Sequence, residues 1–339
     1  MMQAYQPRSM LVTGGAGFIG ANFIRHLLTH EPTINIINLD KLTYAGSLDN
    51  LKQLPNETHY HFIQGDINNV TLLNQIMQQH NIDTIVHFAA ESHVDRSIAS
   101  PEQFIETNVV GTFRLLEAAR KYWFDIAKMN IDSCRFHHIS TDEVFGSLQL
   151  HDALFTERTP YQPRSPYSAS KAGSDHLVNA YHHTFGLPIT LSNCSNNYGP
   201  YQHAEKFIPT VIRACLNQTR IPIYGNGKNI RDWLYVDDHC RGIMQILKQG
   251  KVGDNYNIGG NNEWENIAVA RYICEQMDEL KPRASSHVNL LEFVTDRPGH
   301  DFRYAIDSSK MQNELHWSPV ETFESGIRKT IEFYCQISK

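Results

Sequence analysis

Two short stretches of this sequence place side chains that exchange protons close together. Thr141, Asp142 and Glu143 put a hydroxyl and two carboxyl groups on adjacent positions, directly after a short run, FHHI (136–139), that could be a buried strand. Tyr167 and Lys171 are four residues apart, so they share one face of a helix. A lysine ammonium beside a phenol favours the phenolate and lowers the phenol pKa from about 10. The phenolate can then remove a hydroxyl proton as hydride leaves the same carbon.

Both stretches also have interpretations without chemistry. A Tyr-x-x-x-Lys pair often arises by chance on an exposed helix, and two adjacent acids can cap the segment that follows or face solvent. Hydride transfer needs an acceptor, so the other motifs of the chain decide between these interpretations.

A glycine-rich loop near the N-terminus provides a site for such an acceptor. In LVTGGAGFIG, Gly14, Gly17 and Gly20 satisfy G-x-x-G-x-x-G, and Gly15 with the latter two satisfies G-x-G-x-x-G. Small residues let the backbone turn tightly and approach a pyrophosphate, which then lies at the N-terminus of the following helix. Because the loop follows a strand and opens an apolar-periodic helix, it predicts a dinucleotide site.

Asp40 indicates which dinucleotide to expect. It ends the next predicted strand, twenty residues past Gly20, where a carboxylate accepts hydrogen bonds from a ribose 2′-hydroxyl and repels a 2′-phosphate. We therefore expect NAD rather than NADP, although Lys41 and Arg25 are cations that could hold a phosphate. The positive charge of oxidised nicotinamide would further favour the Tyr167 phenolate.

An alternation of short apolar runs and helical patterns must position these groups. The runs are typical of parallel strands buried on both faces, so the first half predicts a Rossmann-type, doubly wound parallel α/β sheet. The expected strands are Met10–Thr13, Ile34–Asp40, His59–Asp66, Thr84–Ala89 and Arg135–Ser140, and the clearest helices are Phe18–His30 and Val70–His80.

The alternation breaks near Asn196, where Pro and Gly recur and the apolar runs become irregular. We expect residues 1–195 to form an NAD-binding Rossmann domain, with residues of about 230–260 returning to it. Residues 196–339 should form mainly a smaller, mixed α/β lobe that binds the substrate.

Composition excludes several other classes of protein. The 339 residues carry a formal charge of −6 and no basic cluster, so neither nucleic acid nor an anionic membrane is an expected partner. No apolar run approaches the roughly 18 residues of a membrane span, and the N-terminus lacks a signal-peptide core. The six cysteines are scattered without a C-x-x-C pair, which fits a reducing cytoplasm and predicts neither disulfides nor a metal site.

These residues resemble a known family over nearly the whole chain, the extended short-chain dehydrogenase/reductases. In that family the glycine motif, a Ser or Thr at a strand end and Tyr-x-x-x-Lys form the redox site. Phe145 stands where the family often has tyrosine, which removes no group with a named role. Within the family, six stretches of this chain resemble the nucleotide-sugar 4,6-dehydratases most. They are DKLTYAG (40–46), HFAAESHVDRSI (87–98), STDEVFG (140–146), NCSNNYGPYQHAEKFIP (193–209), PIYGNGKNIRDWLYVDDH (222–239) and DRPGHDFRYAID (296–307).

This resemblance gives the two adjacent acids a chemical role. Oxidation at C4 of a glucosyl unit makes a ketone and acidifies the C5 proton, which a base must remove while an acid protonates the departing C6 hydroxyl. The resemblance implies that Asp142 is the general acid and Glu143 the general base. It also implies that Thr141 hydrogen-bonds the C4 oxygen alongside Tyr167, with Lys171 beside them. Adjacent carboxyls can divide these tasks if their pKa values are pushed apart.

The resemblance further implies the lining of the site. It places NAD against Gly14, Gly17, Phe18, Ile19, Gly20, Asp40, Lys41, Thr43, Gly46, Asp66, Ile67, Ala89, Ala90, Ser92, Thr107, Tyr167, Lys171 and Asn197. It places the nucleotide sugar against His93, Thr141, Asn196, Lys206, Phe207, Ile208, Pro222, Tyr224, Arg231, Asn266, Asp296, Arg297 and His300.

A homodimer is the implied assembly, with the Tyr167 helix and the helix near 107–121 forming a four-helix bundle. The apolar positions of the second helix suit either that bundle or packing on the sheet, namely Val109, Phe113, Leu116 and Ala119.

Other functions on the same scaffold remain open. A nucleotide-sugar 4-epimerase or decarboxylase needs Tyr167 and Lys171 but not an acid–base pair at Asp142 and Glu143. A 4,6-dehydratase of another nucleotide sugar, such as UDP-glucose, needs all four groups. A non-enzymatic NAD-sensing regulator usually lacks the Tyr/Lys pair. The two acids therefore favour a 4,6-dehydratase and leave its nucleoside open.

Overall fold

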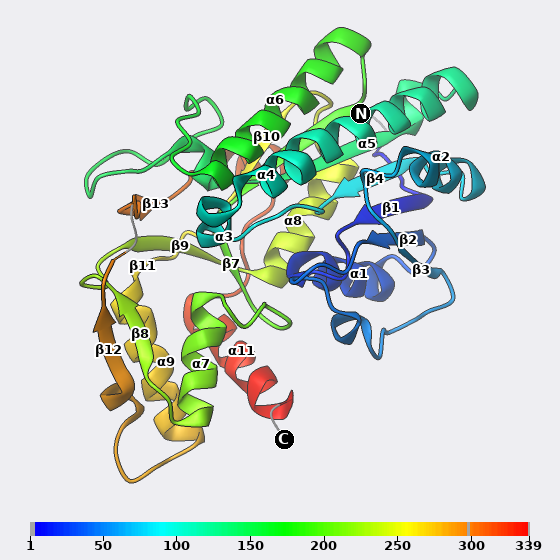
Figure 1. The fold of residues 1–339 in the computed structure, drawn as a ribbon. Coiled ribbons are helices and arrows are strands. Elements are labelled where there is room, and N and C mark those ends of the chain that lie inside the picture. The colour runs from blue at the N-terminus through cyan, green and yellow to red at the C-terminus, as the bar shows by residue number, and fades with distance from the viewer. Residues whose placement is uncertain (1–3, 297–298, 338–339) are drawn as a thin grey trace.

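A seven-stranded parallel sheet with strand order β10-β6-β5-β4-β1-β2-β3 forms the centre of the fold (Figure 1). The structure, a computed structural model, describes residues 4–296 and 299–337. This sheet confirms the predicted doubly wound fold, and all five predicted strands are present with slightly different ends. Its strands are β1 (Ser9–Thr13), β2 (Asn35–Asp40), β3 (Tyr60–Gln64), β4 (Thr84–His87), β5 (Arg135–Thr141), β6 (Ile189–Cys194) and β10 (Asn255–Ile258).

Helices cover both faces of this sheet because successive side chains of each strand point to opposite faces. On β1, Met10 and Val12 pack into one core cluster and Leu11 into the other. Burial of each such side chain stabilises the fold by about 1.5–3 kcal/mol. The helices are α1 (Phe18–His30), α8 (Val236–Gln249) and α10 (Ser309–Leu315) on the Met10 face, and α2 (Val70–Gln79), α5 (Thr112–Arg120) and α6 (Pro166–Phe185) on the other.

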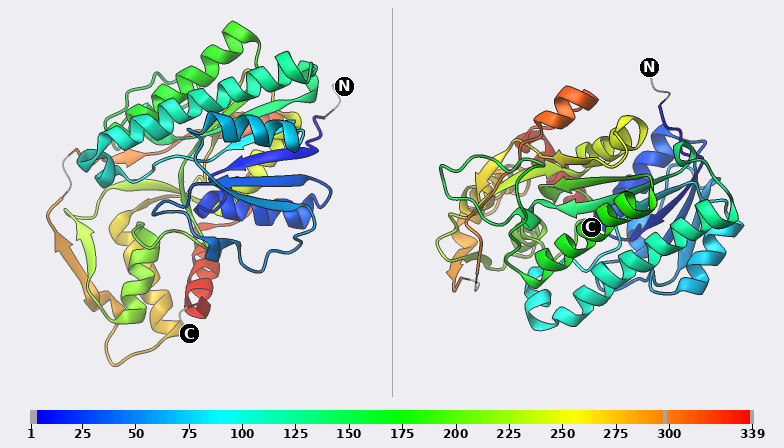
Figure 2. Two further views of the ribbon diagram at one scale, coloured as in Figure 1. Left: turned by 45° about the vertical axis from the view of Figure 1, so that its right-hand side comes forward. Right: turned by 90° about the horizontal axis from the view of Figure 1, so that it is seen from above.

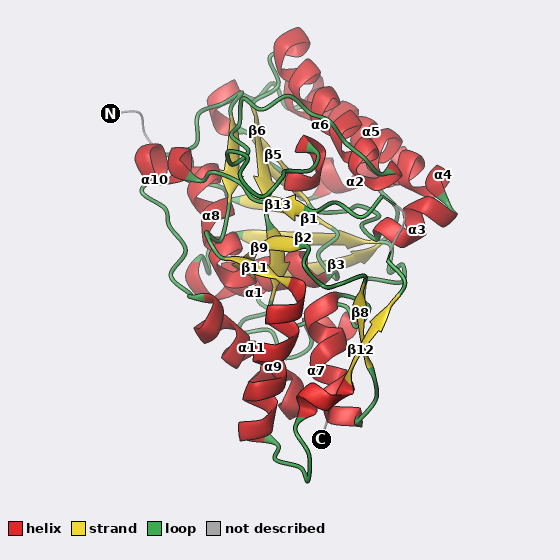
Figure 3. Ribbon diagram, turned by 90° about the vertical axis from the view of Figure 1, so that its left-hand side faces the viewer, coloured by secondary structure: helices red, strands yellow, loops and turns green. Residues whose placement is uncertain are grey.

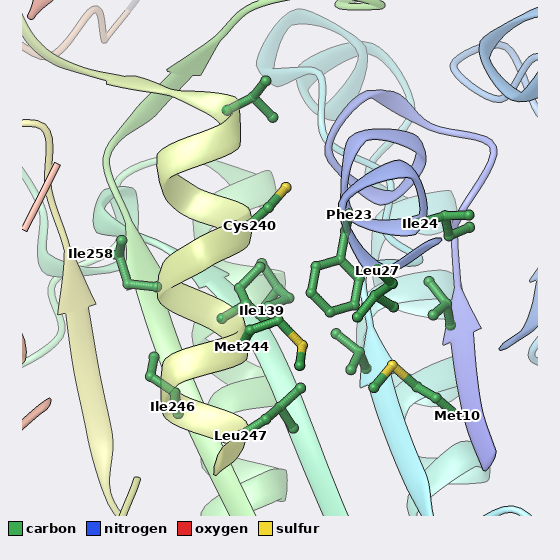
Figure 4. Packing of buried hydrophobic residues seen from close by; sticks show 14 of the residues in the cluster. Met10, Phe23, Ile24, Leu27, Ile139, Cys240, Met244, Ile246, Leu247 and Ile258 are labelled. Carbon is green, nitrogen blue, oxygen red and sulfur yellow. The ribbon is translucent and has the colours of Figure 1, made fainter. Parts of the chain in front are cut away.

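Figure 4 shows how the first of these faces is filled. Phe23 and Leu27 of α1 lie opposite Met244 and Leu247 of α8, and Met10 lies at the foot of the same cluster. This contact brings the segment after residue 235 back onto the sheet that residues 9–194 begin.

On the face of the sheet that carries α5 and α6, a long helical rod runs beside α6, as Figure 2 shows. Backbone dihedrals stay helical from residue 101 to residue 126, and two wide π-helical segments flank α5. The rod follows α3 (Val94–Ala99) and consists of α4 (Pro101–Phe104), η2 (Ile105–Gly111), α5 and η3 (Lys121–Ile126).

The remaining elements form a second lobe below the carboxyl ends of the strands, prominent in Figure 3. It has its own core, in which Tyr198, Trp233 and Phe323 are buried. β9 pairs with β7, β11 and β13, and β8 pairs with β12. The elements are β7 (Asn196–Tyr198), α7 (Phe207–Asn217), β8 (Ile221–Tyr224), β9 (Ile230–Tyr235), β11 (Glu263–Glu265), α9 (Asn266–Leu280), β12 (Leu291–Val294), β13 (Arg303–Tyr304) and α11 (Phe323–Ile337).

Short 3₁₀ turns connect several of these elements, namely η1 (Leu48–Leu51), η4 (Ile131–Ser133), η5 (Asp142–Phe145) and η6 (His287–Leu290). Within residues 4–296 and 299–337, none of the helices combines the length and apolar character that a bilayer crossing requires.

The strand order fixes where a ligand site can form. The chain builds β2 and β3 on one side of β1 and β4, β5 and β6 on the other, so the order reverses between β1 and β4. In open α/β sheets, ligands bind outside the carboxyl ends of the strands at such a reversal. Thr13, Asp40, His87 and Thr141 mark these ends.

Candidate active site

A cavity of about 750 Å³ lies at these strand ends and is lined from both lobes. This volume is within the range of small-molecule and cofactor sites. Every site residue that was predicted from the sequence and that the structure describes lines the cavity, except Ile208 and Asp296.

These two exceptions have different causes. Ile208 follows Phe207 at the start of α7 and turns into the core of the second lobe, so only Phe207 faces the cavity. Asp296 is exposed, and its Oδ1 lies 2.7 Å from Nδ1 of His300, which does line the cavity. Asp296 is thus connected to the site through His300. Arg297 lies outside the described residues.

The glycine loop is shaped for close approach of a ligand to the backbone. Gly14 has a φ of +75°, and a Cβ there would lie 2.6 Å from the backbone nitrogen of Ala89. A Cβ on Gly20 would lie 2.4 Å from the carbonyl oxygen of Gly14. Gly14, Gly17 and Gly20 line the cavity at the N-terminus of α1, whereas Gly15 packs against Asn38. Of the two overlapping glycine patterns, the first therefore faces the site.

Asp40 at the end of β2 is held in place by the loop around it. Its two carboxyl oxygens accept hydrogen bonds of 2.8 Å from the backbone N–H groups of Ala16 and Leu42. Burial raises the Asp40 pKa, and these two bonds oppose that rise. The carboxylate is thus fixed at the cavity wall, where the sequence places a ribose.

The two cations that could have held a 2′-phosphate are engaged elsewhere. Lys41 Nζ lies 2.8 Å from Asp66 Oδ2. Burial is the largest single influence on the Asp66 pKa and acts to raise it, but Lys41, the N–H of Asn68 and the charge of Arg114 together outweigh burial and lower that pKa. Arg25 donates to the carbonyl oxygens of Asn50 and Gln53 at 3.1 and 3.3 Å. Both arrangements favour a free ribose hydroxyl at this position.

The two acids follow β5 in the first turn of η5, and they do not cap it. Thr141 is the capping residue, because its Oγ1 accepts a hydrogen bond of 3.2 Å from the N–H of Glu143. Asp142 is 2% exposed, and Thr141 Oγ1 donates to its Oδ1 at 3.3 Å. Burial raises the Asp142 pKa well above its usual range, and Glu143 and Asp232 add to the rise. Asp142 therefore holds a proton more strongly than an ordinary carboxyl.

Tyr167 and Lys171 lie in the first two turns of α6, whose start is firmly fixed. Ser165 Oγ accepts a hydrogen bond of 3.0 Å from the N–H of Ser168, and Pro166 occupies the first helical position. Tyr167 is hydrogen-bonded to Thr141. The hydroxyl, the phenol and the two carboxyls thus meet in one wall of the cavity.

The pKa of Tyr167 corrects an expectation from the sequence. In the protein chain, burial raises this pKa well above 10, and Glu143 and Cys194 add to the rise. Lys171, whose Nζ donates to the carbonyl oxygen of Ile139 at 2.7 Å, does not by itself offset this rise. A lowered phenol pKa therefore needs positive charge beyond that of Lys171.

Arg231, on β9, reaches the cavity from the second lobe. It donates to the carbonyl oxygens of Ile230, Asp301 and Phe302 at 2.7, 3.0 and 3.3 Å. Its guanidinium lies 4.3 Å from the centre of the Tyr304 ring. These bonds use three of the five N–H donors of an arginine, so a forked grip on a diphosphate requires the other two.

The sequence did not reveal several residues of the cavity rim. Arg96 of α3 lies 3.7 Å from the centre of the Tyr44 ring, and its Nη2 lies 2.9 Å from Glu205 Oε1. Tyr44 and Glu205 line the cavity, as do Asp301 and Tyr304. All these positions lie in the stretches that resemble the dehydratases, but a pairing across 109 residues leaves no signal in one sequence.

The chain matches the family model of GDP-mannose 4,6 dehydratase over residues 11–330. It is 52% identical over 333 residues to the dTDP-glucose 4,6-dehydratase of Salmonella typhimurium, and the alignment covers 96% of this chain and 92% of that protein.

Solved structures show the same similarity. DesIV, a dTDP-glucose 4,6-dehydratase from Streptomyces venezuelae with NAD and TYD bound, has a TM-score of 0.87, 43% identity and 97% coverage of both chains. The dTDP-glucose 4,6-dehydratase of Bacillus anthracis in complex with NAD has a TM-score of 0.85, 44% identity and the same coverage.

Proposed function

This chain belongs to the dTDP-glucose 4,6-dehydratase family, and we propose that it converts dTDP-glucose into dTDP-4-keto-6-deoxyglucose and water. The enzyme is an NAD-dependent lyase on the short-chain dehydrogenase/reductase scaffold. When bound, NAD⁺ takes a hydride from C4 of the glucosyl unit and gives it back at C6 in the same turnover. The side chains of the cavity perform the proton transfers.

The glycine loop and Asp40 fit this cofactor. The N-terminus of α1 offers backbone N–H groups to a pyrophosphate, at a point where side chains on Gly14 or Gly20 would clash. Asp40 accepts hydrogen bonds from the ribose. Lys41, paired with Asp66, leaves no free cation at this point for a 2′-phosphate.

Thr141, Tyr167 and Lys171 carry out the oxidation at C4. Thr141 and Tyr167 hydrogen-bond the C4 hydroxyl, and Tyr167 accepts its proton. Since burial raises the Tyr167 pKa, the phenolate forms only when positive charge lies beside the phenol and lowers that pKa again. Lys171 supplies part of that charge, and the oxidised nicotinamide supplies the rest.

Asp142 and Glu143 then eliminate water across C5 and C6. The C4 ketone acidifies the C5 proton, which Glu143 removes. Asp142, whose raised pKa favours the protonated form, gives its proton to the departing C6 hydroxyl. Glu143 afterwards returns a proton to C5, as C6 is reduced.

The observation that carries this proposal is the placement of a buried carboxyl, Asp142, beside Glu143 in the cavity of Tyr167 and Lys171. A 4-epimerase or decarboxylase has no use for such a pair. The test is turnover of dTDP-glucose, UDP-glucose and CDP-glucose by the purified protein, read as 4-keto sugar absorbance in alkali. We expect dTDP-glucose to react fastest. If UDP-glucose reacted faster, the protein would be a dehydratase of another nucleotide sugar. If none of the three gave a 4-keto product, the proposal would be refuted.

For the two lobes, we propose a division near residue 195, with residues 1–195 and the returning segment binding NAD and residues 196–339 mainly binding the nucleotide sugar. Arg231 and Lys206 supply positive charge for the diphosphate. The other proposed contacts with the nucleotide sugar in this lobe are Asn196, Phe207, Pro222, Tyr224, Asn266 and His300.

We also propose that two copies pair through the helical rod and α6, and that the protein works in the cytoplasm. On the rod, Ile105 is 48% and Phe113 43% exposed, whereas Leu116 and Ala119 are buried in the core of their own chain. The first two residues therefore suit an interface and the last two do not. All six cysteines of the described residues are thiols rather than disulfides, which suits a reducing compartment. Sedimentation of the protein and of a Phe113→Lys variant tests the pairing; a wild-type monomer would refute it.

A further inference from the structure

The catalytic face of α6 continues one turn beyond Lys171. Tyr167, Lys171 and Asp175 follow each other at intervals of four residues, which places them on one face of this helix. Asp175 does not line the cavity and is completely buried, with 0% exposure. A carboxylate at such a position is costly unless nearby groups balance its charge.

Three polar groups converge on the Asp175 carboxylate. Its Oδ2 accepts hydrogen bonds from the hydroxyl of Ser140 at 2.7 Å and from that of Tyr161 at 3.0 Å. Its Oδ1 lies 3.1 Å from Nε2 of His138 on β5. Burial acts to raise the Asp175 pKa, but His138, Lys171 and Ser140 outweigh it and lower that pKa. Asp175 is therefore a carboxylate at neutral pH.

Lys171 needs this negative charge. Its side chain is 5% exposed, and its Nζ contacts the neutral carbonyl of Ile139 and lies 3.4 Å from His138 Nε2. Burial lowers the Lys171 pKa, while Asp175 and, after it, Cys194 oppose this. Burial raises the Cys194 pKa to about 12, so this thiol is neutral at neutral pH.

Among the residues that the structure describes, the other titratable groups beside Lys171 supply no negative charge at neutral pH. Burial lowers the pKa of His138 on β5 to about 4 and the pKa of His87 on β4 well below its usual range, so both imidazoles are neutral. Tyr167, on α6 itself, is a neutral phenol until it gives up its proton. The carboxylate of Asp175 is the charge left to balance the ammonium.

We propose that Asp175 is a positioning residue for the oxidation step: its buried carboxylate, with His138 between them, is the counter-charge that keeps Lys171 protonated beside Tyr167. The inference rests on the proposed function, because Lys171 matters here through its effect on Tyr167. Asp175 touches neither substrate nor cofactor in this scheme and acts only through Lys171.

A structural role for Asp175 makes a different prediction. Through Ser140 and Tyr161 the carboxylate also ties the end of β5 and the preceding loop to α6. If this were its purpose, replacement would lower activity equally at every pH. If it is the counter-charge, replacement lets Lys171 lose its proton at lower pH, and activity falls first on the alkaline side.

The test is the pH profile of C4 oxidation, followed as enzyme-bound NADH in a single turnover with dTDP-glucose. For Asp175→Asn and Asp175→Ser we expect the alkaline limb to move down by about one pH unit or more. Asp175→Glu, which keeps the charge, should restore the limb. Tyr161→Phe is the matched control, because it removes one hydrogen bond from the same carboxylate and leaves its charge. Its limb should stay in place.

A double-mutant cycle with Lys171→Met gives a second measurement. Asp175→Asn should slow oxidation at least tenfold at alkaline pH in the wild-type background and less than threefold in the Lys171→Met background. An unshifted limb in both neutral variants, or equal losses in both backgrounds, would overturn the inference. Failure of the wild-type protein to form any 4-keto sugar would instead overturn the proposed function.

Discussion

Replacing the buried acid Asp142 by asparagine should separate the two halves of the reaction. The amide has the shape of the carboxyl but cannot donate an acidic proton to the C6 hydroxyl. Thr141, Tyr167 and Lys171, which perform the oxidation, are untouched. We therefore expect Asp142→Asn to form enzyme-bound NADH with a 4-keto sugar and then to stall before water leaves.

The size of each effect follows from the environment of Asp142. Loss of a general acid slows its step by about 10² to 10⁴, which is about 3–5 kcal/mol of barrier. Oxidation should change far less, because Asp142 is the last and smallest of the groups that act on the Tyr167 pKa. The raised pKa also favours the uncharged form of Asp142 in the wild-type enzyme, and the neutral amide resembles that form in charge.

Rapid-quench mass spectrometry follows both events in one experiment. Glu143→Gln is the comparison, because it should also stall but, unlike Asp142→Asn, should fail to exchange solvent deuterium into C5. If Asp142→Asn lost water at the wild-type rate, Asp142 would not be the acid. Equal loss of oxidation and elimination would mean that the variant disturbs the site as a whole.

Three further outcomes are expected. Tyr167→Phe removes the proton acceptor and should slow NADH formation in a single turnover by about 10² to 10⁴; near-normal turnover would contradict its role. Asp40→Ala removes the carboxylate that faces the ribose, so the purified variant should retain less NAD per chain, and equal NAD content would count against this position. Burial lowers the pKa of His138 to about 4, below its usual 6.5, so the unfolded chain binds a proton there more readily than the folded protein. The folded protein is therefore not penalised above pH 6.5 and loses stability as the pH falls from 6.5 towards 4. His138 should contribute about 3 kcal/mol to the loss of unfolding free energy measured in urea over that range, beside the other buried histidines, and the loss for His138→Gln should be smaller by about that amount.

Much of the fold was predictable because its pattern is local. β1, β2 and β4 are buried on both faces and read as short, mainly apolar runs, β5 is as deeply buried although it carries two histidines, and α1 has the bounds that its apolar spacing predicts. The glycine loop and Asp40 were predictable for a similar reason. A tight turn and a fixed distance along the chain are properties of one βαβ unit.

Other features depend on contacts that the sequence does not display. Asp175 is an ordinary helical acid in the sequence, and only the approach of β5 buries it against His138. The phenol pKa of Tyr167 could not be predicted from its spacing to Lys171, because burial outweighs the lysine. Ile208 sits beside Phe207 in a motif that resembles the dehydratases, yet Ile208 is fully buried in the core of the second lobe, whereas Phe207 packs at its edge and also lines the cavity.

The central claim is that the hydride removed from C4 is delivered to C6 of the same sugar. Its most direct test is conversion of dTDP-glucose that carries deuterium at C4, with the product analysed by mass spectrometry and NMR. The proposed function predicts deuterium at C6, solvent hydrogen at C5 and no NADH accumulating in proportion to product. Deuterium that remains at C4 would mean that the hydride returned to its own carbon, and it would contradict a 4,6-dehydratase.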